Sequence, residues 1–201
     1  MPTEKLQELK ILEKRPAINF TNTIDWRGKE PPSDYLNNYS DLIDWGNYAG
    51  LLSEAQVKEL KKKAEIAPEE AAKAYEEAIR FREASYRILN QISKGQEIDP
   101  EDKEILDHET RIMLSHLTLN LESKRLELQG ELGLNYLLMV LVKDMVDLLT
   151  SDELPRVKRC SSDECGWLFI DTSKNNSRKW CQMRACGNRA KARRYYKRQQ
   201  Q

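Results

Sequence analysis

All four cysteines of the chain lie within a stretch of 27 residues and form two pairs. The spacing is C-x4-C-x15-C-x4-C, and the residues are Cys160, Cys165, Cys181 and Cys186. The four-residue gap within each pair is wider than the commoner two-residue gap. A zinc ion binds four thiolates at the corners of a tetrahedron, and two short-spaced pairs supply two ligands from each of two turns. The spacing therefore predicts one structural zinc ion.

Two disulfides or four unrelated thiols are the alternatives to a zinc site. The sequence begins MPTEK and has no apolar stretch typical of an export signal, so a cytoplasmic protein with reduced thiols is expected. The segment around the cysteines is also too short and too basic to fold without a metal. Four thiolates leave no open position for water, so we expect the zinc to serve folding and not catalysis.

The two parts of the sequence carry opposite net charges. Residues 156–201 contain 13 Lys or Arg and three acids, a net charge of +10, while residues 1–155 carry a net charge of −10. The large anion that suits a basic end of this kind is nucleic acid. No apolar run approaches the roughly 20 residues that a membrane-spanning helix needs, so no membrane partner is expected.

The basic residues gather around and after the second cysteine pair, where a basic helix is expected. Each Lys or Arg that meets a phosphate releases condensed counterions, so binding would depend steeply on salt. The predicted nucleic-acid-binding residues are Arg178, Lys179, Arg184, Arg189, Lys191, Arg193, Arg194, Lys197 and Arg198. Arginine can bind guanine in bidentate fashion, which favours Arg189, Arg193 and Arg194 for base recognition. A solvated basic tail without a partner is the alternative.

The rest of the chain must position this module, and its patterns predict a body made mainly of helices. Apolar residues recur at intervals of three and four, and Ser53 can cap one helix. One expected helix begins at residue 33 or 34. Further helices are expected over residues 54–66, 69–93, 99–114 and 135–150. Residues 16–26 alternate apolar and polar side chains and predict a short extended segment. Similar alternation at 116–121 and 125–129 predicts a β-hairpin.

The expected fold class is therefore mainly α, of the α+β type. A multi-helical N-terminal domain with a short extended segment and a small β-hairpin precedes a four-cysteine zinc finger with a basic helix. The predicted domains are residues 1–154 and 155–201. Trp167, Phe169 and Trp180 are expected to form the small core of the finger, and stacking on nucleobases is the alternative role.

The residues from Cys160 to Arg198 resemble the CGNR zinc finger. In that family two cysteines precede an aromatic-rich strand that ends in Asp, and an Arg-x-Trp-Cys string, a Met and Cys-Gly-Asn-Arg follow. The matching residues of this sequence are Cys160, Cys165, Leu168 to Asp171, Ser173, Arg178, Trp180, Cys181, Met183, Cys186 to Arg189 and Lys191. The resemblance implies a zinc finger that binds DNA.

The preceding residues resemble the ABATE domain, which stands before such fingers in a family regarded as stress-induced transcription regulators. The matching residues are Phe20 to Thr23, Leu42 to Trp45, Gly50, Leu51 and Arg80 to Glu83. The resemblance implies a DNA-binding regulator whose N-terminal domain senses a small-molecule effector.

The leading hypothesis is a zinc-dependent transcription regulator that binds duplex DNA and is not an enzyme. An RNA- or ribosome-associated zinc protein is the alternative, because a small basic module with exposed aromatic side chains can stack on unpaired bases. A homodimer is also considered, since a single short finger offers few contacts with DNA and two-fold symmetry doubles them.

A third hypothesis is a small-molecule-binding site in the helical domain. The candidate pocket residues are Asn22, Thr23, Arg80, Arg82 and Glu83, and the arginines suit a carboxylate ligand. The alternative is that these residues shape a turn and form structural ion pairs. No glycine-rich phosphate loop or nucleophile signature accompanies the two histidines of the chain, so no catalytic residue is expected.

Overall fold

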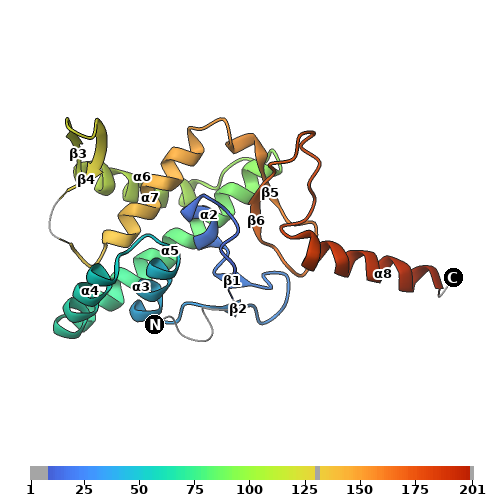
Figure 1. Cartoon of the computed structure of the whole chain (residues 1–201), viewed down its shortest axis with the longest axis horizontal. Coiled ribbons are helices and arrows are strands. Elements are labelled where there is room, and N and C mark those ends of the chain that lie inside the picture. Colours follow the sequence, from blue (N-terminus) through green and yellow to red (C-terminus); the bar gives the residue numbers. More distant parts are fainter. Residues whose placement is uncertain (1–8, 130–131, 200–201) are drawn as a thin grey trace.

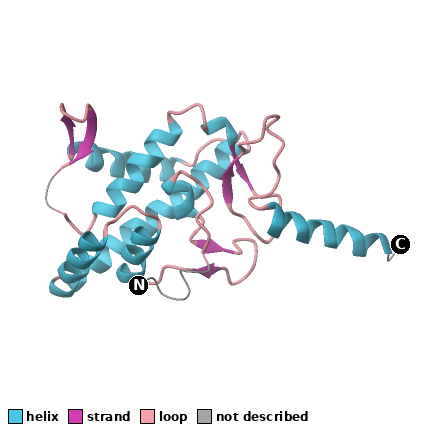
Figure 2. Ribbon diagram, viewed as in Figure 1, coloured by secondary structure: helices cyan, strands magenta, loops and turns pink. Residues whose placement is uncertain are grey.

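The computed structural model describes residues 9–129 and 132–199, and most of these residues are helical (Figure 1, Figure 2). The helices are α2 (Pro16–Thr21), α3 (Tyr39–Tyr48), α4 (Glu54–Ile66), α5 (Pro68–Ser93), α6 (Pro100–Ser115), α7 (Tyr136–Leu149) and α8 (Asn188–Gln199). Three antiparallel pairs join β1 (Ile24–Asp25) to β2 (Ser33–Asp34), β3 (Leu117–Asn120) to β4 (Arg125–Leu128) and β5 (Val157–Arg159) to β6 (Leu168–Ile170). The mainly helical fold with small β-hairpins that the sequence predicts is confirmed.

Helix α5 is the central element of the body. It packs against α2, α3, α4 and α6, and it also contacts β5 and β6. Its buried stripe contains Ala71, Ala74, Ala78 and Ala84, whose small side chains let neighbouring helices approach closely. The helix begins at Pro68, since the first turn needs no amide donor there. Helix α5 runs from the end of the body near α4 to the cysteine module, since it contacts α4 as well as β5 and β6.

The boundaries of α4 follow from local chemistry. The backbone N–H of Gln56 donates to Ser53 Oγ at 3.3 Å, and the N–H of Ser53 donates to Gln56 Oε1 at 2.9 Å. This reciprocal pair satisfies two amide groups that a helix start leaves unpaired. The helix predicted over 54–66 is thereby confirmed.

The extended segment predicted over residues 16–26 is mostly wrong, because residues 16–21 form helix α2. The polar residues that produce the alternation are buried: Asn19 is 5% exposed and Thr21 is fully buried. Asn19 Oδ1 accepts from the N–H of Leu12 at 3.2 Å, and Thr21 Oγ1 donates to Ile18 O at 2.8 Å. Alternation in polarity thus reflects local hydrogen bonding and not a solvent-facing side of a strand.

Helix α3 begins later than the sequence suggests. Ser33 and Asp34 pair with β1, and the helix starts at Tyr39. Asn38 Oδ1 accepts from the N–H of Asp41 at 2.9 Å and caps the first turn. The start predicted at residue 33 or 34 is therefore five or six residues too early.

The hairpin of β3 and β4 is confirmed and lies at the end of the body remote from β5 and β6 (Figure 1). Leu117 pairs with Leu128 and Leu119 with Leu126, so the four leucines share one face. Leu117 and Leu128 pack against the core, whereas Leu119 and Leu126 are each 55% exposed.

One apolar core continues from the helices into the cysteine module. Phe81 and Ile88 of α5 belong to the same buried cluster as Leu168, Phe169 and Ile170 of β6. Strand β6 is buried along its whole length and contacts both α2 and α5. No helix among the described residues is long and apolar enough to cross a membrane.

Candidate metal centre and basic surface

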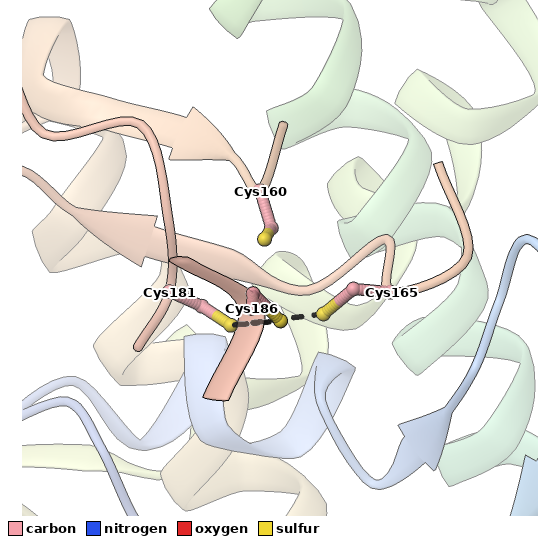
Figure 3. A group of neighbouring side chains, drawn as sticks. All are labelled: Cys160, Cys165, Cys181 and Cys186. Atoms are coloured by element: carbon pink, nitrogen blue, oxygen red, sulfur yellow. Dashed lines mark hydrogen bonds between the residues drawn. The ribbon is translucent and has the colours of Figure 1, made fainter. Parts of the chain in front are cut away.

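The four cysteine sulfurs gather at one buried point (Figure 3). All four Sγ atoms lie within 4.8 Å of one another, and Cys181 Sγ lies 3.6 Å from Cys165 Sγ and 3.7 Å from Cys186 Sγ. Tetrahedral Zn–S bonds of about 2.3 Å place the sulfurs about 3.8 Å apart. A disulfide needs sulfurs only about 2 Å apart. The cluster therefore fits one zinc ion, as the sequence predicts.

The first cysteine pair lies between β5 and β6, at one end of their ribbon. Cys160 follows β5, and its N–H donates to Trp167 O at 2.8 Å. Cys165 lies just before Gly166, whose φ of +73° belongs to the left-handed region. A Cβ at Gly166 would also lie 2.7 Å from the Cβ of Arg27. Glycine is therefore required at this turn for both conformation and space.

Cys181 and Cys186 come from the segment between β6 and α8. Residues Met183–Gly187 form a π-helical turn, and the N–H of Gly187 donates to Gln182 O at 3.2 Å. A Cβ at Gly187 would lie 2.4 Å from the sulfur of Met183. The turn carries Cys186 and continues directly into α8, so the metal site and the basic helix share one rigid connection.

Burial of four thiols together makes their protonation interdependent. The pKa of Cys160 is lowered, first by its hydrogen bond with Cys165 and then by that with Cys181. The pKa of Cys181 is raised, first by its hydrogen bond with the Cys160 sulfur. One thiolate therefore keeps its neighbours protonated as long as no cation joins them. Zinc supplies the positive charge that stabilises all four sulfurs as thiolates.

Arg189 supports the metal centre from outside the sulfur cluster. Its Nη2 donates to Cys186 Sγ at 3.2 Å, and its guanidinium lies 4.5 Å from the centre of the Trp26 ring. Burial alone would lower the pKa of Arg189, but the hydrogen bond to Cys186 and the negative charges of Cys186, Cys165 and Asp25 together outweigh it, and the pKa is raised. A positive charge at this place offsets the excess negative charge of four thiolates around one zinc ion.

Asp171 organises the loop that leads to the second cysteine pair. The carboxylate is fully buried and accepts hydrogen bonds from Lys158 Nζ at 2.7 Å and from the N–H of Arg178 at 2.7 Å. It also accepts from the hydroxyl and the N–H of Ser173, at 2.6 and 2.9 Å. Burial raises the pKa of Asp171, but the hydrogen bonds, first that of Lys158, bring it well below its usual range.

Arg178, one of the predicted nucleic-acid-binding residues, uses its guanidinium inside the module. Its Nε donates to Trp180 O at 2.9 Å, and its Nη1 donates to Ile170 O at 3.1 Å. Its Nη2 donates to Cys181 O, and the group lies 4.4 Å from the centre of the Phe169 ring. Arg178 therefore joins β6 to the second cysteine pair.

The expected core of the finger is confirmed for two of its three aromatic residues. Phe169 is fully buried and Trp167 is 7% exposed, while Trp180 is only partly buried. Trp167 Nε1 donates to Ile24 O at 2.9 Å, so this side chain reaches from the finger to β1. Neither Trp167 nor Phe169 is available to stack on a base.

The body also grips the first cysteine turn by its backbone. The N–H of Arg27 donates to Cys165 O at 3.2 Å, and the N–H of Gly28 donates to Glu164 O at 3.1 Å. A Cβ at Gly28 would lie 1.7 Å from the carbonyl oxygen of Asp163. Gly28 is thus required for the body to approach the turn.

The candidate pocket residues of the body form hydrogen bonds with one another and with the finger. Arg82 is 1% exposed and binds Asp34 Oδ1 and Oδ2 through two nitrogens at 2.9 and 2.7 Å. It also donates to Thr23 Oγ1 at 3.0 Å and to Glu83 Oε1 at 2.9 Å. Burial lowers the pKa of Arg82, but Asp34 and then Glu83 together outweigh this effect, and the pKa is raised.

The other two candidate pocket residues lie apart from this network. Asn22 bonds to the backbone of Leu168 in β6. Arg80 is exposed, and its Nη2 lies 3.7 Å from Oε1 of a different neighbour, Glu109. Asn22 and Arg80 thus bind partners other than Arg82, and this geometry gives no support to a ligand pocket shared by the five residues.

The exposed cations of the finger lie mainly on α8, which extends away from the body (Figure 1, Figure 2). The predicted nucleic-acid-binding residues whose side chains are exposed are Lys179, Arg184, Lys191, Arg193, Arg194 and Arg198. Arg193 also donates to Glu164 Oε2 at 3.1 Å. The side chain of Lys197 lies outside those that the structure describes. Helix α8 itself packs mainly against the turn Met183–Gly187.

Comparison with protein families matches both parts of the chain. Residues 14–152, which include α2 to α7, match the family ABATE, described as "Putative stress-induced transcription regulator". Residues 156–199, which include the four cysteines and α8, match the CGNR zinc finger. None of the curated proteins matches the sequence.

Proposed function

The chain belongs to the ABATE family of stress-induced transcription regulators and carries a CGNR zinc finger, and from this premise we propose that it binds duplex DNA through the finger and is not an enzyme. The observation that carries the proposal is the direct connection of a buried four-cysteine centre to an exposed basic helix. Zinc fixes the turn that ends at Gly187, and this turn aims α8 into solvent.

Helix α8 has the dimensions and the charge for entry into the major groove. Its 12 residues correspond to a length of about 18 Å. The major groove of B-DNA accommodates one α-helix. Lys191, Arg194 and Arg198 are exposed on it, and no acidic residue interrupts the helix. Most of the helix is therefore free to contact a polyanion.

The basic residues divide into two roles. Arg193 and Arg194 are proposed to read base edges, because arginine forms bidentate hydrogen bonds with guanine. Lys191, Lys197 and Arg198 are proposed to bind phosphates and set the register of the helix. Arg178 and Arg189 act indirectly, since their guanidinium groups hold the cysteine turns.

The test is selection of duplexes from a random DNA library with the full-length, zinc-loaded protein, followed by affinity measurements on the enriched sequence. We expect Arg193→Gln with Arg194→Gln to lower affinity at least about tenfold, as each base contact contributes about 1–3 kcal/mol. Lys58→Gln with Lys62→Gln, which removes two exposed charges from α4, is the control and should leave affinity unchanged. No enrichment, or equal affinities for both variants, would overturn the proposal.

RNA is the competing ligand, and one observation favours it. Tyr195 and Tyr196 are 60% and 66% exposed on α8, where aromatic rings can stack on unpaired bases. Competition of a structured RNA against the selected duplex at one salt concentration separates the two. Stronger displacement by RNA than by a second copy of the duplex would assign the finger to RNA.

A further inference from the structure

A further group of cations gathers at the finger, and most of them lie outside α8. Two grooves of about 510 and 560 Å³ adjoin one another and share Ser161 and Lys179. The first is bounded by the end of α5 and by β5, and the second by the start of α8. The two grooves together are here named the basic groove, with Lys94 lining the first and Arg194 the second.

The charge of the basic groove is almost entirely positive. Its charged lining residues are Lys94, Lys158, Arg159, Arg178, Lys179, Arg193 and Arg194, with Asp163 as its acid. Within the described part of the chain, no carboxylate lies at ion-pair distance from Lys94, Lys179 or Arg194. Lys158, by contrast, is neutralised by Asp171 at 2.7 Å. Unneutralised cations along a groove attract a long anion.

Lys94 and Arg159 of the groove come from the end of α5 and from β5, which are remote from the basic helix along the chain. Lys94 is exposed at the C-terminal end of α5, where Gly95 with a φ of +65° ends the helix. Arg159 belongs to β5, and its Nε donates to Tyr86 OH at 3.3 Å, which fixes the side chain at the groove. Sequence patterns give neither residue a role, since both are remote from α8 along the chain.

The groove and α8 form one continuous surface, while the rest of the body is acidic. Residues 1–155 carry a net charge of −10, so DNA that lies along α8 would be repelled wherever it meets the body. Within the basic groove, Lys94 of the body lies beside cations of the finger, and these charges attract a polyanion where the acidic body would repel it.

From this placement we infer that the basic groove is a second phosphate-binding surface, in which Lys94, Arg159 and Lys179 hold the sugar-phosphate backbone of the same DNA that α8 contacts. The inference rests on the proposed DNA binding and adds a contribution of α5 and β5 to it. These contacts are independent of base sequence, because phosphates are identical along the duplex.

The experiment compares three full-length, zinc-loaded proteins on the selected duplex over a series of salt concentrations. We expect Lys94→Gln with Arg159→Gln to reduce the slope of log affinity against log salt by about 1.8, since each phosphate contact contributes about 0.9. The ranking of selected sequences should not change. The control Lys58→Gln with Lys62→Gln should keep the slope of the unmodified protein.

The outcomes separate this inference from the function on which it rests. A slope equal to that of the control overturns the groove while DNA binding by α8 stands. Failure of the unmodified protein to bind any duplex overturns the proposed function itself. If loss of the Arg159 contact with Tyr86 lowers the melting temperature, Lys94→Gln alone decides, with an expected decrease in slope of about 0.9.

Discussion

The side chain of Asn22 pairs with both backbone groups of Leu168: its Oδ1 accepts from the N–H at 2.9 Å and its Nδ2 donates to the carbonyl at 2.9 Å. Asn22 is 2% exposed and follows α2, whereas Leu168 is fully buried in β6. An amide side chain in this position completes the ladder of a strand that has only one partner strand. The pair therefore fastens the finger to the helical body.

We predict that Asn22→Ala lowers the free energy of unfolding by about 2–4 kcal/mol, because it leaves a buried N–H and a buried C=O of Leu168 without partners. Urea denaturation measures the change. Asn22→Asp should be intermediate, since a carboxylate accepts from the N–H but cannot donate to the carbonyl. Asn175→Ala, at an exposed position of the finger, is the control. A loss no larger than that of the control would contradict the role of Asn22.

Removal of zinc should destabilise the whole chain and not the finger alone, because β6 belongs to the same apolar core as α5. We expect chelation, or Cys181→Ser, to lower the melting temperature of the helices by at least about 10 °C, at about 2–4 °C for each kcal/mol in a chain of this size. Far-ultraviolet circular dichroism follows the helices and elemental analysis gives the zinc content. Helices that melt at the same temperature with and without metal would show that the two parts are independent.

Asp171→Asn should destabilise the protein by about 3 kcal/mol at pH 7, since it breaks a buried ion pair with Lys158. The folded pKa of Asp171 is lowered, so its contribution is complete above the unfolded pKa of about 3.9 and is lost as pH falls toward the folded pKa. The difference in unfolding free energy between the two proteins should therefore narrow below about pH 4. Thiol protonation affects both proteins and cancels from the comparison.

The control for this pH series is Asp163→Asn, which removes an exposed carboxylate of the same finger. Its unfolding free energy should follow that of the unmodified protein at each pH. A constant difference between the Asp171→Asn variant and the unmodified protein from pH 7 to pH 3 would argue against the ion pair as the cause.

Two arginines of one helix should give opposite results. Arg189→Gln removes the hydrogen bond to Cys186 and should weaken zinc affinity about tenfold, as expected for a group that supports a metal ligand. Arg194→Gln, with no contact to the cysteines, should leave zinc affinity unchanged and lower DNA affinity. Competition with a chromogenic chelator measures the first quantity. Equal zinc affinities for the two variants would remove the supporting role of Arg189.

Local sequence patterns predict those features that depend on neighbours along the chain. The paired cysteines give the metal centre, and Ser53 with Gln56 gives the start of α4 because the two residues cap each other. The alternation at 116–121 and 125–129 gives the hairpin, although not the register of its pairs. Each of these signals lies within a stretch of at most 27 residues, so no knowledge of the rest of the fold is needed.

Features that depend on residues distant along the chain are not predicted by such local patterns. Arg82 of α5 and Asp34 of β2 form an ion pair across 48 positions of the chain, and only the fold brings them together. The sequence shows that Arg178 and Arg189 are basic. It does not show that their guanidinium groups donate hydrogen bonds to backbone carbonyls and to a cysteine sulfur. The sequence pattern does not predict helix α2, because Asn19 is polar and yet buried.

The separation of charge along the chain has a consequence for the approach to DNA. The acidic body and the basic finger, which Figure 1 places toward one end, make the protein an electric dipole. In the field of a polyanion such a dipole experiences a torque before any contact is made, and it turns with α8 leading. Productive encounters then form faster than random collisions allow, and added salt shortens the range over which this orientation acts.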